Sequence, residues 1–197
     1  MISLQQFQAY AEQGYNRIPI VREVLSDLDT PLSVYLKLAD GPNTYLFESV
    51  EGGETWGRYS IIGLPAKRRF VFRGNTCQEQ VLGETISTEQ LADPLAHVDA
   101  LRLRFKVPQI AELPDFSGGL VGYFGFETIA WIEPKLLPST KPDSLNVPDA
   151  LLLLSEEIAV FDSLKGRLYF IVHADPAEPQ AYVKAQRRLD ELVYRLR

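Results

Sequence analysis

Apolar residues recur at spacings of three and four in several segments of the chain, which is the pattern of helices that bury one face. Three of these segments also begin with a side chain that can cap a helix, and one of the three is Asp93, which precedes Pro94. Ser3 and Gln6 have the spacing of a capping box, and Thr30 stands directly before a proline, which suits a first helical turn. We therefore expect helices over residues 3–13, 30–40, 93–105 and 178–197, and a short one over 127–132.

Other runs are rich in β-branched and aromatic residues and lie between Gly, Asn and Pro turn residues, which is typical of antiparallel strands. Pro19 marks the first run as an edge strand or an extended segment, because proline cannot donate a ladder hydrogen bond. We expect strands over residues 18–24, 44–50, 58–63, 67–73, 76–82, 150–161 and 167–174. The sum predicts an α+β fold, mainly antiparallel sheet with flanking helices.

Four glycines in Ser117–Gly125 invite comparison with a phosphate-binding loop. The spacing matches neither common phosphate-loop motif. We expect these glycines to let a strand bend or approach another backbone closely.

The composition excludes several kinds of site. The 197 residues include one cysteine, Cys77, so neither an internal disulfide nor a cysteine-based metal cluster can form. His97 and His173 are the two histidines, which argues against a multi-histidine metal site. Neither has a Ser or Cys in a recognisable nucleophile motif nearby. The consecutive pair Glu156–Glu157 would point to opposite sides of a strand, which disfavours an acid/base pair.

The net charge of −6 argues against a nucleic-acid surface, which needs a basic excess. A local basic excess over residues 184–197 is expected to be a solvated helix face. The first residues lack the pattern of a signal peptide, and the longest apolar runs are far shorter than a membrane span. We expect a cytoplasmic protein without membrane or nucleic-acid partners.

Polar groups gather around one expected hairpin. The two strands carry Leu46-Phe47-Glu48-Ser49 and Arg58-Tyr59-Ser60. Their two serine hydroxyls, one carboxylate and one guanidinium form a set that could hold a zwitterion. Strand alternation places Glu48 and Ser49 on opposite faces unless a bulge intervenes. An edge strand with solvated polar residues is the alternative interpretation.

The same stretches resemble a known family. Thr44–Ser49, Gly57–Gly63, Thr30–Leu38 and Gly118–Gly125 are similar to the N-terminal region of anthranilate synthase component I, and the likeness extends from about Asn16 to Ala174. The resemblance implies a lyase that converts chorismate to anthranilate and pyruvate. It also implies magnesium, ammonia from a glutamine amidotransferase subunit, and feedback inhibition by tryptophan.

Members of this family are much longer, and their chorismate and magnesium residues belong to a C-terminal domain. The resemblance therefore implies that residues 1–175 form the N-terminal regulatory domain and that residues 176–197 lead toward an absent C-terminal chorismate-binding domain. It implies no catalytic residue, metal or cofactor within these residues, which would be inactive alone.

The family's Leu-Leu-Glu-Ser motif binds L-tryptophan, and it aligns here with residues 46–49, with Phe47 replacing a leucine. The resemblance implies that Ser49 is the serine most closely tied to inhibition and that Ser60 matches a second one. Tyr59 stands where some relatives have a lysine. The expected tryptophan-binding residues are Leu46, Glu48, Ser49, Arg58, Tyr59 and Ser60.

Two alternatives remain open at this point. The chain could be the equivalent domain of aminodeoxychorismate synthase component I, from folate synthesis. It could also be a docking scaffold for the glutaminase subunit that binds no small molecule.

Overall fold

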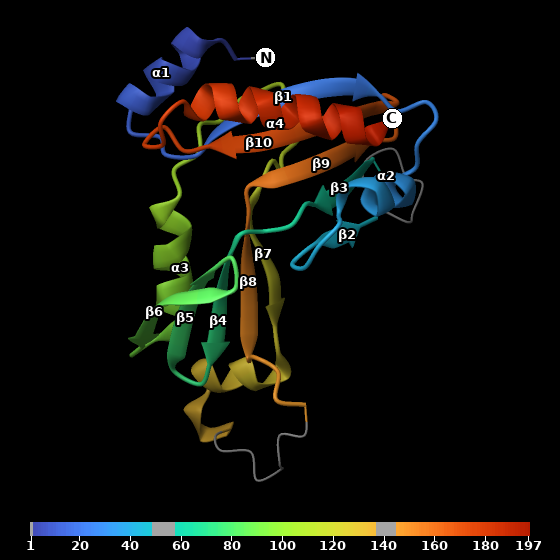
Figure 1. The fold of residues 1–197 in the computed structure, drawn as a ribbon. Helices are drawn as coiled ribbons and strands as arrows, with labels where there is room; N and C mark the ends of the chain where they lie inside the picture. The colour runs from blue at the N-terminus through green and yellow to red at the C-terminus, as the bar shows by residue number, and fades with distance from the viewer. Residues whose placement is uncertain (1, 49–57, 137–144) are drawn as a thin grey trace. The chain divides into compact units, whose positions relative to one another are not determined.

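The computed structural model describes residues 2–48, 58–136 and 145–197 (Figure 1). The chain divides into two compact units. Unit 1 comprises Met1–Ala66, Phe105–Gly119 and Ser155–Arg197, and unit 2 comprises Lys67–Arg104 and Leu120–Leu154. Each unit is built around its own antiparallel sheet. The expected α+β fold is confirmed.

The sheet of unit 1 has the strand order β1-β10-β9-β3-β2. Neighbouring strands are antiparallel, and the β1–β10 pair runs from Ile18 opposite Ala174 to Leu25 opposite Arg167. Its strands are β1 (Ile18–Leu25), β2 (Tyr45–Phe47), β3 (Tyr59–Gly63), β9 (Glu157–Asp162) and β10 (Arg167–Ala174). β1 lies at an edge of this order, as Pro19 predicts.

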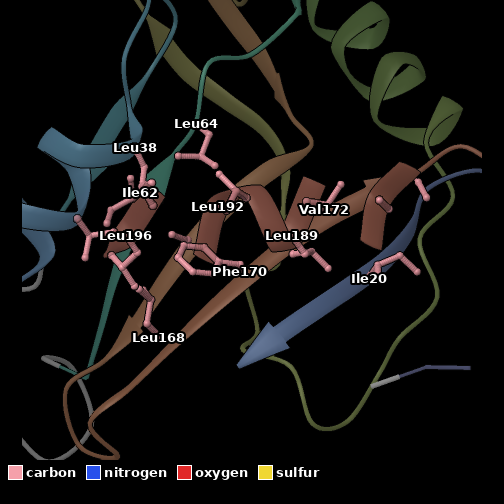
Figure 2. Packing of buried hydrophobic residues seen from close by; sticks show 14 of the residues in the cluster. Ile20, Leu38, Ile62, Leu64, Leu168, Phe170, Val172, Leu189, Leu192 and Leu196 are labelled. Atoms are coloured by element: carbon pink, nitrogen blue, oxygen red, sulfur yellow. The ribbon is translucent and has the colours of Figure 1, made fainter. Parts of the chain in front are cut away.

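Three helices contribute to the apolar core on one face of this sheet: α1 (Leu4–Glu12), α2 (Pro31–Leu38) and α4 (Ala181–Leu196). The helical spacing of α4 brings Leu189, Leu192 and Leu196 onto its inner side. Figure 2 shows these leucines facing Phe170 and Ile20 of the sheet. All five residues are buried, so α4 is an integral part of the core of unit 1.

A smaller cluster covers the opposite face of the same sheet. Ile158, Val160, Tyr169 and Ile171 form it, and Tyr59, Val21, Leu113 and Phe116 pack against it. The central strands β9 and β10 are therefore apolar on both sides, which explains their nearly continuous hydrophobic sequences.

The sheet of unit 2 has the strand order β6-β5-β4-β8-β7. Its strands are β4 (Arg68–Arg73), β5 (Thr76–Val81), β6 (Glu84–Gln90), β7 (Gly119–Phe124) and β8 (Ala150–Ser155). One α-helix, α3 (Pro94–Arg104), and two 3₁₀ helices, η1 (Phe126–Trp131) and η2 (Pro134–Leu136), belong to the same part of the chain.

All three helix starts predicted from capping residues are confirmed. Ser3 and Gln6 form a reciprocal capping box at α1, and Thr30 forms one with Ser33 at α2. Asp93 accepts two backbone N–H groups at the start of α3. These local signals succeed because the partners of each cap lie within three residues of one another.

The single strand predicted over residues 150–161 is wrong. Residues 150–155 form β8, which pairs with β4, whereas residues 157–162 form β9, which pairs with β3 and β10. Glu156 separates them, and its carboxylate accepts a 2.5 Å hydrogen bond from Arg17. The polar residues Ser155, Glu156 and Glu157 interrupt the apolar run where the chain changes sheet. They mark the break, but the sheet that each half joins is set by pairing with strands distant in sequence.

Three further elements differ from the predictions. β6 was not predicted, since its side chains are mostly exposed and polar. The last helix begins at Ala181, three residues later than predicted, after Gln180 adopts a left-handed φ of 57°. The short helix expected over 127–132 is the 3₁₀ helix η1.

The glycine-rich segment behaves as predicted. A side chain at Gly122 of β7 would overlap the backbone carbonyl of Leu151 in the neighbouring β8. At Gly118, whose φ is +137°, a Cβ would lie 2.7 Å from the carbonyl oxygen of Ser155. These glycines therefore allow close backbone approach. None of the described helices is long and apolar enough to span a membrane.

Candidate functional site

The β2–β3 ladder carries the residues that sequence analysis singled out. Leu46 pairs with Ile62 across this ladder and packs against the main core of unit 1. Ser60 lies two residues before Ile62 and is 5% exposed. Side chains two residues apart share a face of a strand, so Leu46 and Ser60 lie on the face that the helices cover.

Tyr59 lies on the other face of β3. Its ring packs against the smaller apolar cluster that contains Val160 and Tyr169. Burial raises the pKa of the Tyr59 hydroxyl, with a further contribution from the Asp162 carboxylate. Tyr59 and Ser60 therefore cannot both line one pocket on a single face of the sheet.

Arg58 is held by a carboxylate that sequence analysis did not identify. Its Nε and one terminal nitrogen donate to the two carboxylate oxygens of Asp162, at 2.9 and 2.6 Å. The guanidinium also lies 4.8 Å from the centre of the Tyr59 ring. This bidentate bond ties the start of β3 to the end of β9 and occupies the guanidinium within the protein.

Asp162 has a second role in the same place. Its Oδ1 accepts the backbone N–H groups of Leu164 and Lys165, which fixes the hairpin turn between β9 and β10. Burial would raise the pKa of this carboxyl, but the hydrogen bonds from Arg58 and the turn outweigh that effect and hold the pKa below its usual range. No local signal could have identified Asp162, because Arg58 and Asp162 are far apart in sequence.

Tyr45 fixes the position of β2. Its ring lies over Gly63 of β3, where any larger residue would overlap it. Its hydroxyl is 2.7 Å from the hydroxyl of Ser155, and its ring centre is 4.9 Å from that of Phe47. Burial raises the pKa of Tyr45, while the bond with Ser155 opposes this rise. Tyr45 and Gly63 are adjacent to predicted site residues, and an aromatic residue opposite a glycine is a recognisable pairing in a sheet.

The remaining predicted residues lie at the end of this ladder. Glu48 directly follows β2 and is exposed. Ser49 lies outside the described residues. The structure thus places Leu46 and Ser60 on adjacent strands, with Arg58 directly before β3, and puts Tyr59 and Ser60 on opposite faces of the sheet.

The other candidate groups are held in structural interactions. Arg17 contacts Glu156, and Arg188 contacts Glu157, so the two consecutive carboxylates have different partners. Burial raises the pKa of the Cys77 thiol to about 12. Among the described residues, no group of three or more His, Cys, Asp or Glu side chains could hold a metal ion.

His173 is buried in β10. Burial, with a smaller contribution from the positive charge of Arg17, lowers the pKa of this histidine to about 4. The imidazole packs against Gly118, and within the described part of the chain its Nε2 has no hydrogen-bond partner. A neutral, enclosed imidazole of this kind supports packing rather than proton transfer with solvent.

Comparison with known proteins connects this fold to one family. No family model matches the chain. Anthranilate synthase component 1 of Neisseria meningitidis serogroup C is 52% identical over 200 residues, covering 100% of this chain and 40% of that protein. The protein of the same name from Pseudomonas aeruginosa is 51% identical over 195 residues, covering 98% of this chain and 39% of that protein.

More distant relatives give the same result. Anthranilate synthase component 1 of Acetivibrio thermocellus is 33% identical over 181 residues, covering 90% of this chain and 36% of that protein. The crystal structure of anthranilate synthase component I from Streptococcus pneumoniae has a TM-score of 0.53 and 24% identity, covering 86% of this chain and 36% of that one, which supports the fold. The chain spans about 40% of the length of its curated relatives. Over its whole length, the chain therefore belongs to the anthranilate synthase component 1 family, whose N-terminal part it matches.

Proposed function

We propose that these residues are the N-terminal, tryptophan-binding feedback domain of an enzyme that makes anthranilate from chorismate. The observation that carries the proposal is the match, over the whole chain, to proteins named anthranilate synthase component 1. In such an enzyme the magnesium-dependent lyase chemistry belongs to a C-terminal chorismate-binding domain, and ammonia comes from a glutamine amidotransferase subunit. The present residues would then be inactive alone.

The β2–β3 ladder suits an amino-acid ligand. Leu46 is apolar, Ser60 is a buried hydroxyl, and Glu48 is a carboxylate at the end of β2. An amino acid needs a carboxylate or carbonyl for its ammonium group and hydroxyls or amides for its carboxylate. Ser49, directly after Glu48, supplies the second hydroxyl. The guanidinium of Arg58 is already hydrogen-bonded to Asp162. Arg58 therefore holds the start of β3 in place and does not contact the ligand.

Feedback inhibition is a coupling free energy between the tryptophan site and the catalytic site. Tryptophan must therefore make different contacts in the active and inhibited arrangements of the complete enzyme. A hydrogen bond from a serine to a charged ligand group contributes about 1.5–3 kcal/mol. The loss of that bond corresponds to roughly 10–150-fold weaker binding.

The direct test replaces Ser49 with alanine in the complete enzyme. We expect Ser49→Ala to raise the tryptophan concentration for half-maximal inhibition by roughly 10–150-fold. Ser87→Ala serves as the matched control, since Ser87 lies on β6 in unit 2, and it should leave inhibition unchanged. Equal inhibition of the Ser49→Ala variant and the parent enzyme would contradict the assignment of this site.

Two further measurements separate the alternatives. Relatives named anthranilate synthase favour anthranilate over aminodeoxychorismate as the product, and an assay of both products decides between them. Calorimetric titration of the complete chain with tryptophan, with phenylalanine as the control ligand, distinguishes a sensing domain from a docking scaffold. A scaffold without a ligand site would give no heat with either amino acid.

A further inference from the structure

An exposed apolar ridge runs along the 3₁₀ helix η1 of unit 2. A 3₁₀ helix has three residues per turn, so side chains three residues apart lie directly above one another. Phe126, Ile129 and the C-terminal cap residue Ile132 have this spacing, and their exposed fractions are 88%, 40% and 69%. We call these three residues the apolar ridge.

The opposite side of η1 is firmly packed. Ala130 is buried, and the Trp131 ring lies 5.8 Å from that of Phe72 and 6.4 Å, edge-on, from that of Phe124. The backbone N–H of Gly125, just before η1, donates to the carbonyl of Asp149 at 2.7 Å. With Trp131 and Ala130 held inward, the ridge cannot turn toward the core without breaking these contacts.

The chemistry of the ridge suits a permanent partner. Its three side chains are uncharged and apolar. Contiguous apolar patches on isolated proteins mark interaction sites. The centre of a permanent interface is depleted in charge and rich in aromatic and aliphatic side chains, as this ridge is.

The length of the relatives indicates what covers the ridge. They match the whole of this chain, and about 60% of their own length lies beyond the match in the same polypeptide. We propose that the apolar ridge is the surface on which unit 2 docks against the polypeptide that follows in the complete protein. This inference rests on the proposed function, which requires such a following domain.

The test measures access to the ridge in the complete protein. Cysteine is introduced singly as Phe126→Cys and Ile132→Cys, and Thr88→Cys on β6 is the exposed control in the same unit. The rate at which each variant reacts with a water-soluble maleimide is measured, and the rate of the parent protein is subtracted. Cys77 contributes little within these residues, because it is buried and burial raises its pKa to about 12.

We expect both ridge positions to react at least tenfold more slowly than Thr88→Cys. Rates equal to that of the control, in variants whose circular dichroism matches the parent, would overturn the proposal. Hydroxyl-radical oxidation of Phe126 in the unsubstituted protein gives the same information without a substitution, and strong oxidation would likewise overturn it.

Other occupants give different results. If slow labelling of the ridge becomes fast on dilution, the ridge is covered by a second copy of the protein. If labelling is slow only when the glutaminase subunit is added, the ridge is covered by that subunit. Either outcome overturns the proposal. Failure of tryptophan to inhibit would contradict the proposed function while leaving these labelling rates unaffected, so the two failures are distinguishable.

Discussion

Single residues in this chain act largely through the space that they fill or leave empty. Gly63 leaves room for the Tyr45 ring, Gly118 for the His173 imidazole, and Gly122 for the backbone of β8. The glycine-rich sequence predicted close approach, but its partners could not be named, because Leu151 lies 29 residues after Gly122 and Ser155 lies 37 residues after Gly118.

Gly122→Ala tests the tightest of these approaches. The added methyl group would overlap the Leu151 carbonyl, so β7 and β8 must separate. We expect a loss of about 1–3 kcal/mol in the free energy of unfolding, measured by urea denaturation. Gly74→Asn is the control: Gly74 has a φ of +53°, which asparagine tolerates, and open space around it. Equal effects of the two substitutions would contradict the packing argument.

His173 makes stability depend on pH. Its pKa is 6.5 in an unfolded chain and about 4 in the fold, so the unfolded state binds more protons between these values. Stability is fully present above pH 6.5 and falls as the pH drops toward 4, by up to about 3 kcal/mol. The measurement is the free energy of unfolding of the parent minus that of His173→Gln, which should decrease over this range. A difference that stays constant from pH 7 to 4 would contradict the prediction.

At the scale of elements, features that depend on neighbouring residues could be predicted, whereas features that depend on pairing between distant strands could not. The capping residues Ser3 and Thr30 located α1 and α2, and helical spacing identified the buried side of α4. The polar residues Ser155, Glu156 and Glu157 mark the break between β8 and β9, but no local pattern encodes the pairing of β8 with β4 and of β9 with β3. β6 was missed because an exposed polar strand has no apolar alternation.

In the candidate site, too, local patterns identified residues, while contacts between distant strands could not be foreseen. Leu46, Arg58 and Ser60 were found by residue type and motif; Leu46 lies on β2, Ser60 on β3 and Arg58 directly before β3. The burial of Ser60 and the opposite placement of Tyr59 follow from strand alternation. The capture of Arg58 by Asp162 could not be predicted, because it depends on the pairing of β3 with β9.

Substitution of Leu189 tests the contribution of α4. This residue is fully buried between α4 and the sheet of unit 1. We expect Leu189→Ala to lower the free energy of unfolding by about 2–5 kcal/mol, through lost apolar contact and a cavity. Val183→Ala, on the same helix but with a side chain 52% exposed, should cost no more than about 0.5 kcal/mol. Chemical denaturation of both variants provides the comparison.

At the scale of the whole molecule, the chain is divided into units that are not continuous in sequence. It passes from one unit to the other four times, after residues 66, 104, 119 and 154. A deletion of residues 67–104 alone would therefore remove β4, β5, β6 and α3 but leave β7 and β8 without their sheet. Neither unit can be isolated by one simple truncation.

The pairing of β1 with β10 also affects events on the ribosome. Leu25 leaves the exit tunnel more than 140 positions before its partner Arg167. At synthesis rates of about 5–20 residues per second, this delay is on the order of 10 s. The β4–β5–β6 meander needs only short-range pairs and can form during that interval. The apolar residues Ile18 and Ile20 of β1 remain uncovered on the nascent chain until β10 emerges, which makes this strand a natural target for chaperones during synthesis.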